Sequence, residues 1–155
     1  PQRRGHGATG GPMAEAVARA VVGRAADKDA PPMPPIRVGS AGVATRAGGL
    51  MTPEAEEALS ELGIDPGDHR SRPLSREMVA EADFIFAMTR GHIEAILAAD
   101  PSASEKVRLL DPEGGDVPDP IGGTQDDYRA AARRIRAMVE SRLAEIAAAD
   151  RRPRE

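Results

Sequence analysis

From Gly5 to Ala16 the chain reads GHGATGGPMAEA, a glycine-rich segment that leads directly into a helix-like apolar pattern. Four glycines lie within seven residues, and Pro12 stands where the first helical turn would begin. A glycine-rich loop before a helix often binds phosphate, because backbone N–H groups point toward the anion and the helix dipole adds about half a positive charge. The segment 5–11 nevertheless holds no Cys, Ser, Lys or Arg. It therefore has the outline of a phosphate cradle without the usual side chains.

The composition is that of a single globular domain. A chain of 155 residues with 40% apolar and 30% charged residues can bury a core of ordinary size. Aromatic residues make up only 2%, so Ala, Val, Leu, Ile and Met must form that core. No apolar run approaches the ~18 residues of a membrane span and no signal peptide is visible. We therefore expect a cytoplasmic protein with no membrane partner.

Absent and rare residue types exclude several kinds of chemistry. The sequence has no cysteine, which excludes disulfides, thiolate nucleophiles and cysteine-ligated zinc. Its histidines, His6, His69 and His92, are far apart, so we predict no metal site and no cofactor. A net charge of −4 argues against nucleic acid as a partner.

Apolar periodicity and capping residues predict alternating helices and strands. Helices are expected over residues 12–26, 53–62, from 75 onward, 90–97 and 124–149, and strands over residues 36–38, 83–88 and 106–110. This alternation predicts an α/β fold with a parallel sheet, in which ligands bind at the carboxyl ends of the strands. The loops at that edge are residues 40–42, 88–90 and 111–123.

The expected first strand is missing from this pattern. Only Pro1–Arg4 precede Gly5, and none of these four residues is apolar. Without that strand two inner edges of the sheet would be unpaired, at about 1–3 kcal/mol for each buried backbone group. Five or so such groups would threaten a typical stability of ~5–15 kcal/mol. We therefore predict that the chain is marginally stable, or that residues 1–11 fill the gap irregularly.

From Pro12 onward the chain resembles the low-molecular-weight protein tyrosine phosphatases, including their bacterial arginine-phosphatase branch. The matching segments occur in the family's order, at roughly its spacing, and comprise Pro12–Ala16, Ser40–Gly42, His69–Ser71, Ala82–Thr89 and Val117–Gly123. The resemblance implies a three-layer α/β/α fold with a short parallel sheet, here with its first strand missing or irregular. It divides the chain into a flexible remnant of the phosphate loop (1–11), a phosphatase-like domain (12–149) and a frayed tail (150–155).

In that family a C-x5-R-S loop carries the catalysis. The Cys attacks phosphorus, the Arg binds the phosphate oxygens, and an Asp in an Asp-Pro loop protonates the leaving group. When the chain is aligned with the family pattern at Pro12 without a gap, the nucleophile position falls on Arg4. When the alignment allows a one-residue deletion, the nucleophile position falls on Gly5. Without the gap the arginine position falls on Gly10, and neither register supplies the Cys or the phosphate-binding Arg. The loop as a whole corresponds to Gly5, His6, Gly7, Ala8, Thr9, Gly10 and Gly11.

Other parts of the family's site are present. Asp119, followed by Pro120, matches the general acid, and Ser40 and His69 match residues that brace the phosphate loop. The resemblance implies a hydrolase that acts on a phosphorylated protein, or a site for a phosphate-like anion. Because the Cys and the loop Arg are absent, we predict that these 155 residues are inactive. The alternatives are a non-enzymatic pseudophosphatase that binds its ligand, or a truncated or misread product of a gene for an active phosphatase.

Overall fold

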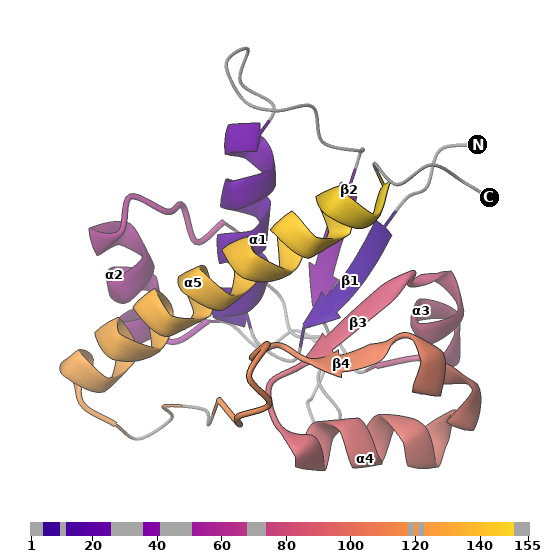
Figure 1. The fold of residues 1–155 in the computed structure, drawn as a ribbon. Coiled ribbons are helices and arrows are strands. Elements are labelled where there is room, and N and C mark those ends of the chain that lie inside the picture. The colour runs from indigo at the N-terminus through magenta and orange to yellow at the C-terminus, as the bar shows by residue number, and fades with distance from the viewer. Residues whose placement is uncertain are drawn as a thin grey trace.

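The computed structural model describes residues 5–9, 12–25, 36–40, 51–67, 74–117, 120 and 123–150. In this part of the chain one parallel sheet contains the strands β1 (Gly5–Thr9), β2 (Ile36–Ser40), β3 (Phe84–Ala87) and β4 (Val107–Leu109). The strand order is β2-β1-β3-β4, so β1 and β3 lie inside the sheet and β2 and β4 lie at its edges (Figure 1).

Three of the helices follow residues that cap their first turns. The described helices are α1 (Pro12–Ala25), α2 (Pro53–Glu61), α3 (Arg76–Glu81), α4 (Arg90–Ala99), the 3₁₀-helix η1 (Pro101–Glu105) and α5 (Gln125–Asp150). Thr52, Ser75 and Thr89 each accept a backbone N–H from the following turn, at 3.1–3.3 Å. These side chains satisfy amide donors that a helix N-terminus leaves unpaired, so α2, α3 and α4 start close to where the sequence predicts, whereas η1 was not predicted.

Two apolar cores lie on opposite faces of the sheet. One combines α1, α2 and α5 and includes Val17, Leu59 and Ile135; the other combines α3, α4 and η1 and includes Val79 and Ile96. Side chains of a strand alternate between its faces, and in β3 Phe86 joins the first core whereas Ile85 joins the second. The sheet therefore separates two helical layers, which confirms the predicted three-layer α/β/α fold.

The expectation that the first strand is missing or irregular is wrong. Gly7, Ala8 and Thr9 pair in register with β2 on one side and with Phe84–Phe86 of β3 on the other. Residues 5–9, expected in a flexible segment ahead of the domain, are thus part of its sheet. The expectation rested on the lack of apolar side chains before Gly5. Strands, however, pair through backbone N–H and C=O groups, and glycine has both. The argument for marginal stability, which assumed unpaired inner edges, loses its premise.

Candidate functional site at the carboxyl edge of the sheet

The parallel strands all end at one edge of the sheet, where the candidate site was expected. Thr9 and Ser40 end β1 and β2 there and are register partners. Met88 follows β3, and α4 begins at Arg90. This edge is the usual position for ligands in a sheet of this kind.

The segment compared with the phosphate loop is mostly strand. Residues 5–9 form β1, and residues 10 and 11, which lie outside the described residues, are all that separate Thr9 from Pro12 of α1. Gly7, Ala8 and Thr9 lie between two hydrogen-bonded neighbours. Their amide groups therefore face the adjacent strands and are not arranged around an anion. This corrects the expectation of a loop for residues 5–9.

The structure also separates Gly5, one of the two nucleophile positions, from the carboxyl edge. Gly5 is the first residue of β1, four residues before Thr9. At the ~3.3 Å rise per residue of a parallel strand, its Cα lies about 13 Å from that of Thr9. Arg4, the other possible position, lies outside the described residues.

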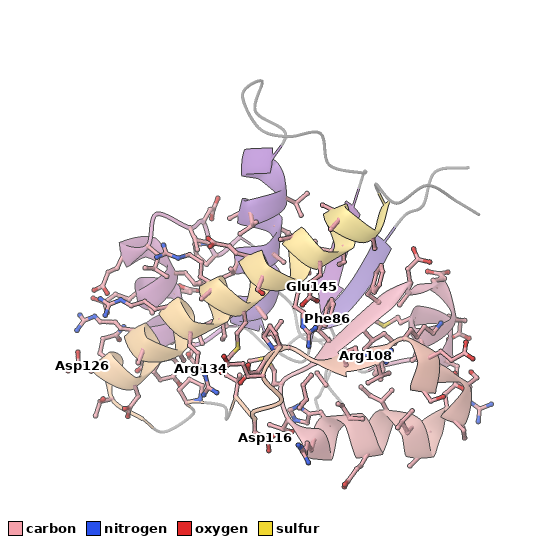
Figure 2. All side chains as sticks on the ribbon, viewed as in Figure 1. Phe86, Arg108, Asp116, Asp126, Arg134 and Glu145 are labelled. Atoms are coloured by element: carbon pink, nitrogen blue, oxygen red, sulfur yellow. The ribbon has the colours of Figure 1, made fainter. Side chains whose placement is uncertain are left out.

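The acid loop, residues 111–123, is bound to the end of β3 and the start of α4 before its central residues, and a turn closes after them. The amide of Val117 donates to the Met88 carbonyl at the end of β3 at 2.8 Å, and the amide of Gly123 donates to the Pro120 carbonyl at 2.7 Å. The Asp116 carboxylate accepts the amide of Arg90 at 2.9 Å, which joins the loop to the start of α4 (Figure 2). Asp119 itself lies outside the described residues, as does His69, and nothing is described of the Ser40 side chain.

Asp111, a buried carboxylate that sequence reasoning missed, organises the start of this loop. It is 8% exposed and accepts the amides of Glu113 at 2.9 Å and Gly115 at 3.2 Å. Arg134 of α5 reaches the same carboxylate at 3.5 Å. The segment DPEGG was itself a signal, because Asp often caps its own turn when Pro and Gly follow.

Two further polar residues near this edge are buried, or have a buried polar atom, although the sequence did not predict it. Glu15, in the first turn of α1, is 7% exposed and forms an ion pair with Arg19 at 2.8 Å, in the i,i+4 arrangement that the sequence displays. His92, in the first turn of α4, has a buried Nδ1 for which the described residues supply no hydrogen-bond partner. No sequence signal distinguishes a buried from an exposed ring nitrogen there.

The fold and this site define the class of small α/β proteins in which a parallel sheet carries an Asp-Pro loop after its last strand. The model of the family described as low molecular weight phosphotyrosine protein phosphatase matches residues 7–152. The chain therefore belongs to that family.

Similar proteins include bacterial arginine phosphatases. The chain is 34% identical over 145 residues to the protein-arginine-phosphatase of Bacillus subtilis, covering 91% of each chain. It is 35% identical over 117 residues to that of Geobacillus stearothermophilus, covering 73% of this chain and 78% of the relative. The structure of YwlE arginine phosphatase from Geobacillus stearothermophilus superposes over the full length of both chains, with a TM-score of 0.81 and 28% identity. A YwlE mutant with a phosphorylated active-site serine superposes with a TM-score of 0.79 and 30% identity, over 91% of this chain and 93% of that one.

Among the described helices, none is both long and apolar enough to cross a membrane.

Proposed function

We propose that this chain keeps the scaffold and the acid loop of a low-molecular-weight protein phosphatase but does not hydrolyse phosphate esters or phosphoramidates by the cysteine route. The observation that carries the proposal is the absence of cysteine from all 155 residues. Arg4 or Gly5 stands at the nucleophile position, and neither register supplies the phosphate-binding arginine.

The chemistry of the remaining residues supports this proposal. The family's reaction needs a thiolate, because a hydroxyl group at neutral pH is a weak nucleophile unless a neighbouring base activates it. Asp119 could still donate a proton, and general acid catalysis contributes about 10²–10⁴-fold. That contribution is of little use without a nucleophile that displaces the leaving group as Asp119 protonates it.

Within the family, we assign the chain to the arginine-phosphatase branch. Its 34–35% identity to two protein-arginine-phosphatases supports the assignment. So do Thr9, which in the gapped register falls where that branch carries Thr, and Ile121-Gly122-Gly123, which lacks the aromatic pair that flanks a phenyl ring in eukaryotic tyrosine-specific members. The partner class would then be a protein phosphorylated on arginine.

The test is a phosphate-release assay with p-nitrophenyl phosphate, a phosphotyrosine peptide and a phosphoarginine protein. The expected result is no release above the uncatalysed rate. Release that disappears in Asp119→Ala would overturn the proposal and require another nucleophile. Release that Asp119→Ala leaves unchanged would identify a contaminating phosphatase.

A phosphate-binding role without turnover is the second candidate. The position of β1, two residues before the N-terminus of α1, favours it, because that N-terminus still offers unpaired amide groups at the carboxyl edge. An NMR titration with inorganic phosphate tests it: shifts confined to Thr9, the first turn of α1, Ser40 and Asp119 support binding, and unchanged spectra contradict it.

A further inference from the structure

Arg142, in the last third of α5, contacts β3, the end of β4 and the start of the acid loop. Its side chain is only 14% exposed, although its ion-pair partner Glu145, at 2.9 Å, is 54% exposed. A charged side chain is buried at a cost unless polar groups surround it, so its neighbours decide its role.

The guanidinium of Arg142 lies against the end of β4. Its N–H groups donate to the carbonyls of Leu109 at 2.6 Å and Leu110 at 3.2 Å, and approach that of Asp111 at 3.5 Å. The same group lies 5.3 Å from the centre of the Phe86 ring of β3. Figure 2 labels two of the partners of Arg142, which are Phe86 on β3 and Glu145 on α5.

These three carbonyls stand where the chain leaves the sheet. β4 ends at Leu109, and Asp111 opens the loop that leads to Asp119. Hydrogen bonds from a charged donor are stronger than neutral ones, and a carbonyl deprived of such a donor in a buried position is left unsatisfied. Arg142 is therefore well placed to determine the path of the chain at this point.

The described contacts extend from Arg142 into the first half of the acid loop, as far as Val117. The Asp111 carboxylate, one residue beyond Leu110, holds the amides of Glu113 and Gly115, and the Val117 amide is bound to the end of β3. Asp119 follows two residues after Val117. We infer that Arg142 is a positioning residue, which fixes the acid loop by holding the carbonyls at the end of β4. This role does not depend on whether the chain turns over a substrate.

The test is hydrogen exchange of individual amides, measured by NMR on Arg142→Gln and the wild type. In the variant, the amides of Glu113, Gly115 and Val117 should exchange about tenfold faster or more, because the loop opens locally. The amide of Ile64, which follows α2, donates to the carbonyl of Leu59 inside that helix. Its exchange rate should stay within about twofold of the wild-type rate. The matched control is Arg133→Gln, which removes an exposed arginine of the same helix and should leave all four rates unchanged.

Two outcomes with Arg142→Gln would overturn the inference. An equal acceleration at Ile64 and in the loop would make Arg142 a general stabiliser of the fold, and unchanged rates in the loop would deny it any role there.

Arg142→Lys keeps the test decisive if Arg142→Gln does not fold. Lysine retains the charge and the apolar stem but not the planar group that reaches two carbonyls at once, so a smaller, loop-specific acceleration is expected. A loop that exchanges at the wild-type rate in Arg142→Lys contradicts the inference, as does failure of both variants to fold.

Discussion

Gly115 illustrates how a single residue supports the acid loop. A Cβ at this position would lie 2.5 Å from the Asp111 carboxylate oxygen and 3.4 Å from Arg134. Gly115→Ala should therefore displace the carboxylate from its two amide partners and lower the free energy of unfolding by about 1–3 kcal/mol. Urea unfolding measures the change.

The control for this substitution is Gly91→Ala. A Cβ there would meet its nearest neighbour, the Thr89 hydroxyl oxygen, at an ordinary 3.7 Å. Gly91→Ala should leave the stability unchanged or raise it slightly. Equal effects of the two substitutions would show that Asp111 does not hold the turn.

Glu61 should make stability depend on pH in a narrow acidic range. Arg129 donates two hydrogen bonds to its carboxylate, at 2.7 and 2.9 Å, and this lowers the pKa of Glu61 below its ordinary value of 4.5. Because the pKa is lowered in the folded state, the stabilisation is fully present above pH 4.5 and is lost as the pH falls through the folded-state value.

Glu61→Gln tests this dependence through urea midpoints measured between pH 7 and pH 3. The wild type should be slightly more stable at neutral pH, and the difference should shrink below about pH 4.5. High salt should reduce the difference, since the pair is exposed. A difference that grows on acidification would contradict the assignment.

At the scale of elements, α1 contains a glycine whose position in the helix needs neither a positive φ nor a close approach of neighbouring atoms. Gly23 lies in the last turns of the helix, is exposed, and has no atom within 4 Å of an added Cβ. Gly23→Ala should raise the free energy of unfolding by about 0.5–1 kcal/mol, because alanine loses less backbone entropy on folding. A thermal or urea unfolding curve measures it, and a destabilised variant would show that this turn is not helical in solution.

The elements differ in how well the sequence predicts them. Helices α2, α3 and α4 each follow a Thr or Ser whose hydroxyl caps the first turn, so local chemistry alone marks their start. Strand β1 has no such mark, because Gly5 and Gly7 carry no side chain that could display a strand pattern. The rings of Phe84 and Phe86 on the neighbouring strand, stacked with centroids 6.3 Å apart, supply apolar surface beside it instead.

For the whole molecule, the path of β1 predicts that a thiol alone does not restore catalysis. In Gly5→Cys the thiol would start at the amino end of β1, about 13 Å along the strand from the carboxyl edge. We expect no phosphate release from p-nitrophenyl phosphate, although a thiol reagent should detect the new cysteine after unfolding. Release that Asp119→Ala abolishes would show that residues 5–11 can form the family's loop.

The candidate site could be predicted from the sequence only in part. Asp119 and Ser40 are recognisable because their motifs are local, and the end of β2 does place Ser40 at the expected edge. The buried state of Asp111 and the contacts of Arg142 could not be predicted. They join residues 23 to 33 positions apart, and the same side chains would be solvated on an isolated helix or loop.

By itself, the sequence determined that the chain is a member of the low-molecular-weight phosphatase family and that it contains no cysteine, because motifs and composition are properties of the chain alone. Only the tertiary structure decided that residues 5–9 are a strand and that the acid loop is held at both β3 and α5. The physical reason is that these features depend on backbone pairing and on hydrogen bonds between distant segments, which no local pattern of side chains records.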